Sequence, residues 1–257
     1  MQNKRVIVYF LDFGEIGSVS GGEMTKSNFI FWLGLIIGAL GSAMATRKIL
    51  EKSRLPNRKT WQRLMAKQRG PVRAGIFLAK TGSHYETLMM QRPTLESRVL
   101  RLHLETNITP CLALYRVFLE ESVDQKAALK ATEHLLENWI RTTPPFWFRF
   151  NQLLSRTPIN FSNFRRYTRW LMRFVFPSPA WDTIYIADNN STLAFNIYQC
   201  FYLDMLRYYQ APELTPVFCK VDDIMMELLP KEIRWARSNT MGQGADYCDF
   251  CWHHQPH

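Results

Sequence analysis

The sequence has few cysteines for its 257 residues, and their number, five, is odd. Small secreted domains held together by disulfides carry many cysteines, usually in even numbers, so this chain does not match that class. Reduced thiols in a cytoplasmic setting are the expectation. The pair Cys248-x-x-Cys251 has no second Cys-x-x-Cys pair beside it, so the chain also lacks the ligand pattern of a zinc ribbon.

Basic residues are concentrated in one stretch. Between Arg47 and Arg73 a single acid, Glu51, stands against ten basic residues, which is a net charge of +9 out of the chain's total of +10. The rest of the chain is therefore close to neutral. Proteins that bind DNA or RNA through a whole domain carry a basic face on that domain, and this pattern is missing here. No nucleic-acid partner is expected.

Only one long apolar run is present. Phe29–Ala45 is seventeen residues without a charge, which is the lower limit for a transmembrane helix. The basic stretch that follows favours a single-pass membrane anchor with the next domain in the cytoplasm, and it would lie against the anionic leaflet. Two alternatives stay open. Ala43-Met44-Ala45 resembles a signal-peptide cleavage site, and so short a run also occurs in buried helices.

This pattern divides the chain into four parts. We expect a flexible leader over 1–26, a membrane anchor over 27–46, a basic juxtamembrane connector over 47–90 and a folded domain over 91–257. Apolar residues make up 47 % of the chain, which is enough to bury a core in a domain of that length.

Apolar residues recur every three to four positions from Thr94 onward, and this period predicts helices. Pro110 is expected to interrupt the first of them, and a mostly apolar helix is expected over 112–119. Ser122-Val-Asp-Gln125 has the form of a capping box, so another helix is expected to follow it and to end within 142–145.

The segment 146–176 is rich in aromatic residues and arginine. Its apolar residues fit one face of a helix, and its arginines lie largely on the other: Phe164, Leu171, Phe174 and Val175 against Arg165, Arg166, Arg169 and Arg173. An amphipathic helix that packs its apolar face inward is the first interpretation. Contact with a membrane surface is the second, and stacking on nucleic acid is the third.

After Pro179 the hydrophobic period changes to two, which indicates strands. The expected elements are a strand over 181–187, a turn over 188–190, a strand over 193–198, a helix over 201–209, a helical piece after Cys219, a strand over 233–240, a turn over 241–244 and a strand over 247–252. The fold class is therefore α+β, with N-terminal helices packed on a C-terminal antiparallel sheet and a single hydrophobic membrane-anchor helix before them.

Thiols and carboxylates gather in the last quarter of the chain. Cys200, Cys219 and Cys248 are candidate nucleophiles, and Asp223 and Asp249 are candidate general bases or acids. A thiolate is a strong nucleophile, and a carboxylate can move the proton that such chemistry requires. Taken one at a time, each cysteine is better interpreted as a buried packing residue, since free cysteine is among the most often buried residues.

The order of residues over 95–252 resembles the L-2-amino-thiazoline-4-carboxylic acid hydrolase family. The matching landmarks are Pro110-Cys-Leu-Ala-Leu-Tyr115-Arg116, Cys200 with Tyr202 and Asp204, Pro212-Glu213-Leu214, Phe218-Cys219-x-x-x-Asp223, Arg237-x-x-Thr240-x-Gly242 and Cys248-Asp249-Phe250. Cys251 is a departure, because a basic residue is more usual at that position of the family.

The resemblance implies a small-molecule substrate and hydrolytic opening of a cyclic amidine-like thiazoline acid to an N-carbamoyl amino acid. Attack at the carbon between nitrogen and sulfur needs a thiolate or a water activated by a carboxylate. Arg237 suits the substrate carboxylate, since its planar fork matches that group. The alternative for Arg237 is a salt bridge on a strand.

No cofactor is expected, with zinc as the alternative. Cys248 and Cys251 are followed by three histidines, yet residues three apart on a strand point to opposite faces, so these two cysteines would not share an ion. Three separated cysteines and one histidine could still converge. His103 and His134 are expected to be surface or hydrogen-bonded core residues. A non-catalytic small-molecule or zinc-binding domain tethered to the membrane is thus the second functional hypothesis.

Overall fold

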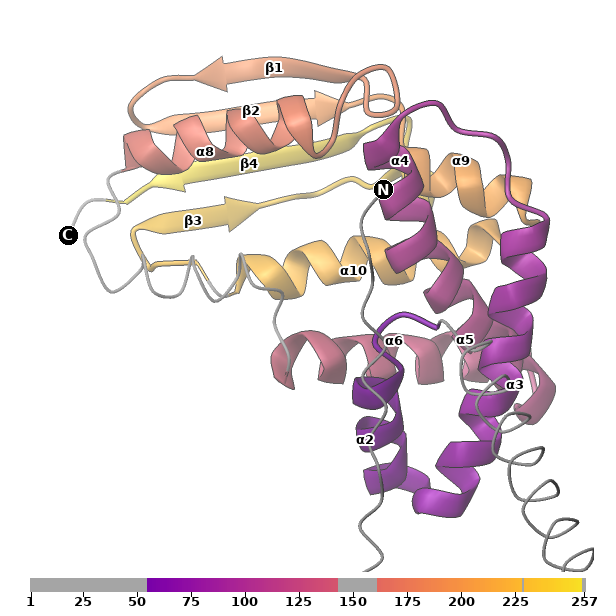
Figure 1. Cartoon of the computed structure of the whole chain (residues 1–257). Helices are drawn as coiled ribbons and strands as arrows, with labels where there is room; N and C mark the ends of the chain where they lie inside the picture. Colours follow the sequence, from indigo (N-terminus) through magenta and orange to yellow (C-terminus); the bar gives the residue numbers. More distant parts are fainter. Residues whose placement is uncertain (1–54, 143–160, 228, 256–257) are drawn as a thin grey trace, which may run out of the picture. The chain divides into compact units, whose positions relative to one another are not determined.

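The computed structural model describes residues 55–142, 161–227 and 229–255 (Figure 1). The chain divides into two units, Met1–Lys52 and Ser53–His257, and all described residues belong to the second. The expected leader, the run Phe29–Ala45 and the first part of the basic stretch lie outside the described residues. Within the described ranges, no helix is both long and apolar enough to cross a membrane.

Helices occupy the first part of the described unit, and a sheet with two further helices occupies the last part. The helices are α2 (Arg58–Arg69), α3 (Pro71–Met90), α4 (Arg98–His103), the π-helical turn η1 (Leu104–Ile108), α5 (Thr109–Glu121), α6 (Gln125–Thr142) and α8 (Phe161–Phe174). Then follow β1 (Thr183–Asp188), β2 (Thr192–Ile197), α9 (Phe201–Tyr208), the 3₁₀ turn η2 (Pro212–Leu214), α10 (Thr215–Met226), β3 (Ile233–Ala236), the 3₁₀ turn η3 (Met241–Gln243) and β4 (Cys248–His254). The α+β class is confirmed.

The four strands form one antiparallel sheet in the order β1-β2-β4-β3. The predicted hairpin β1–β2 is present, and the predicted last strand pairs with both β2 and β3. Alternate residues build one packed face: Phe195 lies opposite Phe250, and Leu193 lies opposite Trp252. Helix α8 contacts this same face, because the ring of Phe164 lies 5.6 Å from that of Trp252.

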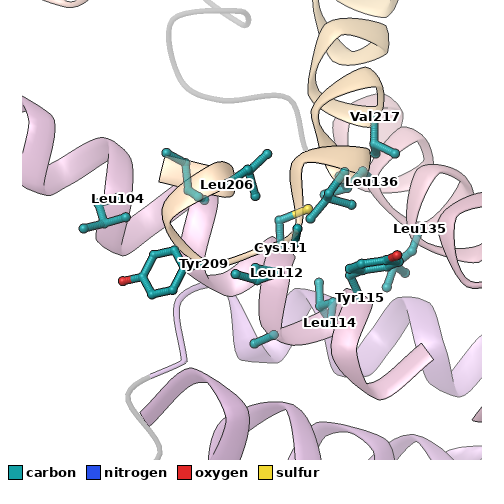
Figure 2. Packing of buried hydrophobic residues seen from close by; sticks show 14 of the residues in the cluster. Leu104, Cys111, Leu112, Leu114, Tyr115, Leu135, Leu136, Leu206, Tyr209 and Val217 are labelled. Atoms are coloured by element: carbon teal, nitrogen blue, oxygen red, sulfur yellow. The ribbon is translucent and has the colours of Figure 1, made fainter. Parts of the chain in front are cut away.

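The helical core is centred on α5, which is buried on nearly all sides and packs against both α3 and α6. Its apolar residues, including Cys111, Leu112 and Leu114, meet leucines of α6 and α9 in Figure 2. A helix with apolar residues on nearly all sides is stable in such an interior position, and its charged residues Arg116, Glu120 and Glu121 are not buried. Cys111 is 2 % exposed among these side chains and is therefore a packing residue.

The expected connector over 47–90 differs from the structure wherever the structure describes it. Residues 58–90 form α2 and α3, and their buried side chains, including Trp61, Met65 and Phe77, join the main hydrophobic core. The basic residues of α2 hid this pattern, since Trp61, Leu64 and Met65 have helical spacing within a strongly charged segment. The folded domain thus includes helices before residue 91.

Pro110 does not interrupt the helical path. The chain runs from α4 through η1 directly into α5, with Pro110 in the first turn of α5. A proline lacks the backbone N–H that an α-helix interior needs, and a π-helical turn is a common local change of hydrogen bonding within a helix. The turn η1 places that change just ahead of the proline.

Helix α6 is capped by Asp124 rather than by the first residue of the expected capping box. The Asp124 carboxylate accepts a 2.7 Å hydrogen bond from the backbone N–H of Ala127. We therefore expect Asp124→Ala to lower the free energy of unfolding by about 1 kcal/mol, and Ser122→Ala to change it by only a few tenths. Urea unfolding of both variants checks this, and an equal loss in the two would contradict it.

The arginine-rich helix begins at Phe161, so only the second half of the expected segment lies in the described residues. Phe161 and Thr168 are buried and Phe164 packs on the core, whereas Trp170 and Phe174 are each 51 % exposed. The spacing of Phe174 from Phe164 predicted that both lie on the inward face. For Phe174 this prediction is wrong, because half of its side chain is exposed.

Candidate functional site

Cys219 and Cys248 lie on either side of the turn η3. Cys219 is in the second turn of α10, which begins at Thr215, before the cysteine and not after it as expected. A Cβ at Gly242 would come 2.9 Å from the Cys219 Sγ and 3.1 Å from the backbone N of Pro216, so this turn can approach α10 only with glycine there. On the other side, the backbone N–H of Met241 donates to the Cys248 Sγ at 3.2 Å.

Arg237 joins the end of the β3 segment to α10. Its Nη1 donates to Asp222 at 3.2 Å, and its Nη2 donates to the Asp223 carboxylate and to the Cys219 carbonyl, both at 2.7 Å. The guanidinium also lies over the rings of Trp235 and Phe250, and its side chain is only 5 % exposed. A buried cation with this many partners holds the strand, the helix and both carboxylates in one arrangement.

Asp222 is the carboxyl whose acidity the site changes most. Burial raises its pKa to about 6, although the charge and hydrogen bond of Arg237 oppose this increase. About one third of the side chain, 35 %, still meets solvent. Asp222 is therefore largely surrounded by protein yet reached by water, and it can bind or release a proton near neutral pH.

The three candidate thiols are electrostatically linked to Asp222 and to one another. Burial raises the pKa of Cys200 and of Cys219 to about 12, and Asp222 adds to both increases. Burial also raises the pKa of Cys248, with the backbone N–H of Met241 and the Arg237 charge opposing it. At neutral pH these three groups are thiols, which are much weaker nucleophiles than thiolates.

A polar network of buried and partly buried side chains borders the thiols. Cys200 stands at the N-cap position of α9 without a side-chain capping hydrogen bond, and Tyr202 in the first turn interacts electrostatically with both Asp222 and Cys200. The Tyr202 hydroxyl lies 3.0 Å from the Nδ1 of His103 and accepts a hydrogen bond from Asn107 at 3.2 Å. The Nε2 of His103 donates to the Val175 carbonyl at 2.8 Å, so the prediction that this histidine is a hydrogen-bonded core residue is confirmed.

Asp249 has a structural position outside this group. Its carboxylate accepts hydrogen bonds from the backbone N–H of Ser238, at 2.9 and 3.0 Å, from the Ser238 hydroxyl at 2.7 Å and from the backbone N–H of Asn239. Burial raises the pKa of Asp249, but these hydrogen bonds outweigh it and hold the pKa below its ordinary value. Asp249 thus fixes the loop after β3. Asp249 is adjacent to Cys248 on a strand, so the sequence already indicates that their side chains point to opposite faces of the sheet.

Cys251 likewise lies apart from Cys248. Its Sγ contacts the Nε2 of His253 at 3.3 Å on the side of β4 that also carries Asp249, whereas Cys248 contacts the η3 turn. The two cysteines of the Cys-x-x-Cys pair thus point to opposite faces, as the spacing predicts. Among the residues that the structure describes, no three His, Cys, Asp or Glu side chains are arranged to hold a metal ion.

The structure brings together five of the six residues named from the sequence, namely Cys200, Cys219, Cys248, Asp223 and Arg237. Asp223 belongs to the same cluster as a partner of Arg237 and of the Trp235 Nε1, while Asp249 does not. Asp222 was missed. Asp222 and Asp223 follow Cys219 by three and four residues, so both lie on the side of the helix that carries Cys219. This spacing indicates the pair but does not indicate which of the two carboxyls acts in the site.

The family comparison coincides with these elements. Residues 102–252 match the L-2-amino-thiazoline-4-carboxylic acid hydrolase family, and this range contains α5, α9, α10, η3 and every residue of the cluster around Asp222. No curated protein and no solved structure matches the chain. The matched range covers more than half of the 257 residues, so the chain belongs to the L-2-amino-thiazoline-4-carboxylic acid hydrolase family.

Proposed function

We propose that this protein is a hydrolase that opens a cyclic amidine-like ring, such as that of 2-amino-thiazoline-4-carboxylate, to give an N-carbamoyl amino acid. The observation that carries the proposal is Asp222, a carboxyl with a pKa of about 6 that is reached by water and lies within the family's matched region. A group of this acidity can act as general base and general acid in the same reaction at neutral pH.

The attacking group in this proposal is water. The Asp222 carboxylate takes a proton from water as the water oxygen adds to the ring carbon between nitrogen and sulfur, and the proton passes to the ring nitrogen. The carboxylate then takes the remaining hydroxyl proton as the carbonyl forms. The carbon–sulfur bond breaks with its electron pair on sulfur, and Asp222 returns the proton there. One water is consumed, and its two protons end as N–H and S–H.

The neighbours of Asp222 have supporting roles. Arg237 orients Asp222 and keeps its pKa from rising further, because the cation favours the ionised carboxyl. Its donors are engaged with Asp222, Asp223 and the Cys219 carbonyl, so binding of the substrate carboxylate by Arg237 remains a prediction. The protonated thiols supply neutral, polarisable surroundings, which help to desolvate the carboxyl.

A ring-opening assay with 2-amino-thiazoline-4-carboxylate tests the proposal directly. The wild-type chain is expected to release a free thiol, measured with a thiol reagent, together with the carbamoyl product. Cys200→Ser, Cys219→Ser and Cys248→Ser are each expected to retain activity, since the serine hydroxyl has nearly the size of the thiol and is also uncharged at neutral pH. Loss of activity in one variant alone would assign the nucleophile to that thiol. No activity in the wild type would favour a non-catalytic small-molecule-binding domain.

The pH dependence separates the two nucleophiles. If Asp222 is the base, its ionised form is active, so the rate is expected to rise as the pH passes through about 6 and then to stay level. A thiolate from Cys200 or Cys219, with a pKa of about 12, would instead make the rate keep rising above neutral pH. Initial rates measured from acidic to alkaline pH distinguish these profiles.

A further inference from the structure

The outward face of α8 is unlike the solvent face of an ordinary amphipathic helix. Trp170 and Phe174 are each 51 % exposed, and Arg166 and Arg173 are exposed on the same side. The Arg173 guanidinium lies 5.3 Å from the centre of the Phe174 ring. The opposite side of the helix, with Phe161 and Phe164, packs on the sheet (Figure 1). Helix α8 therefore has one apolar side buried and large aromatic side chains on the other side as well.

The charge of this surface is one-sided. Helix α8 carries four arginines and no acid, and Asp188 of β1 pairs with two of them, Arg165 at 2.6 Å and Arg169 at 2.8 Å. Four positive charges against one negative charge leave a net charge of +3. These two ion pairs also fix the helix against the hairpin, so Trp170, Arg173 and Phe174 are presented from a rigid support.

We propose that the outward face of α8, formed by Arg166, Trp170, Arg173 and Phe174, docks on an anionic lipid surface. Helices that lie in the membrane interface combine basic residues, which attract anionic headgroups, with tryptophan and phenylalanine, which enter the boundary of the acyl region. The sequence of the uncharged run Phe29–Ala45 and of the basic stretch after it independently predicts contact of this chain with a membrane. A nucleic acid is a less suitable partner for this surface, because proteins that bind nucleic acids carry a basic face over a whole domain. Outside 47–73 this chain is close to neutral.

Tryptophan fluorescence of the full-length chain tests the docking. The difference in emission between the wild type and Trp170→Phe isolates the signal of Trp170 from the other tryptophans. We expect vesicles of phosphatidylcholine with one third phosphatidylglycerol to move this signal to shorter wavelengths, and a brominated lipid to quench it. Pure phosphatidylcholine vesicles are expected to do so much less, and added salt is expected to weaken the effect. The Trp252→Phe difference signal, from a tryptophan that is 3 % exposed, is the control and is expected not to change.

Charge variants provide a second measurement. Arg166→Gln and Arg173→Gln are each expected to weaken vesicle binding by about five-fold, since each basic residue near an anionic surface contributes that much. Val72→Ser with Ile76→Ser, which removes exposed apolar side chains from α3, is the matched control and is expected to have no effect.

The proposal is overturned if the Trp170 signal stays constant while the chain co-sediments with vesicles, or if neutral vesicles shift the Trp170 signal as much as anionic vesicles do. A shift caused by an oligonucleotide or by raising the protein concentration, without one caused by vesicles, also overturns it.

Discussion

Asp222→Asn is expected to lower the turnover number for ring opening by a factor of about 10² to 10⁴, which is the usual loss when a general base or acid is removed. Asparagine cannot take a proton from water, but it has nearly the same size as aspartate. Arg237 keeps its hydrogen bonds to Asp223 and to the Cys219 carbonyl, so the fold is expected to persist. Steady-state rates and a circular dichroism spectrum of the variant check both expectations.

Asp223→Asn is the matched control, because it also removes one carboxylate from Arg237. It is expected to reduce turnover much less than Asp222→Asn and to keep the rise of the rate near pH 6. In the Asp222→Asn variant any residual activity is expected to lose that rise, since the group that titrates there is gone. Equal losses in the two variants, with the pH profile unchanged in both, would reduce Asp222 to a structural partner of Arg237.

Phe77→Ala is expected to lower the free energy of unfolding by about 3–5 kcal/mol, because truncating a buried phenylalanine leaves a cavity in the core. Phe77 is 1 % exposed in α3, and its ring lies 4.8 Å from that of Phe118 in α5. The predicted loss follows from the finding that α3 belongs to the folded unit. Chemical unfolding monitored by tryptophan fluorescence measures it, since the core also contains Trp61 and Trp181.

The neighbouring Ile76→Ala provides the comparison for this loss. Ile76 lies on the same helix and is 56 % exposed, so its truncation is expected to change stability by no more than about 0.5 kcal/mol. If Phe77→Ala were as mild as Ile76→Ala, α3 would be dispensable and the folded domain would start later, as the sequence alone suggested.

Local patterns predicted most of the C-terminal half. The alternation of apolar residues around the Asp188–Asn190 turn predicted the β1–β2 hairpin, and the last strand was expected within two residues of its observed ends. In β2 the period reflects burial of every second residue, Leu193, Phe195 and Ile197, whereas no residue of β1 is buried. Helices α2 and α3 were harder to predict from the sequence, because the segment is strongly charged. Only a few of its residues, such as Trp61 and Met65, are apolar and pack in the core.

The site was predicted as a group but not in its roles. Ordered landmarks pointed to the cysteines and Arg237, and the structure brings these together around η3. The roles of these residues depend on hydrogen bonds to residues distant in the chain. Asp222 and Asp223 accept from Arg237, and Asp249 accepts from the loop at Ser238. Burial raises the pKa of Asp222, whereas hydrogen bonds lower the pKa of Asp249, and a linear pattern measures neither effect.

The sequence by itself determined the α+β class, the order of the strands along the chain, the family and the set of thiols and carboxylates near Cys219. Side-chain period and residue order are local properties, so they can be read from one chain. Only the tertiary structure decided that burial raises the pKa of Asp222 to about 6, that hydrogen bonds hold the pKa of Asp249 below its ordinary value, and that Trp170 and Phe174 face outward. These outcomes depend on which groups from other elements surround a side chain, and packing in three dimensions sets that environment.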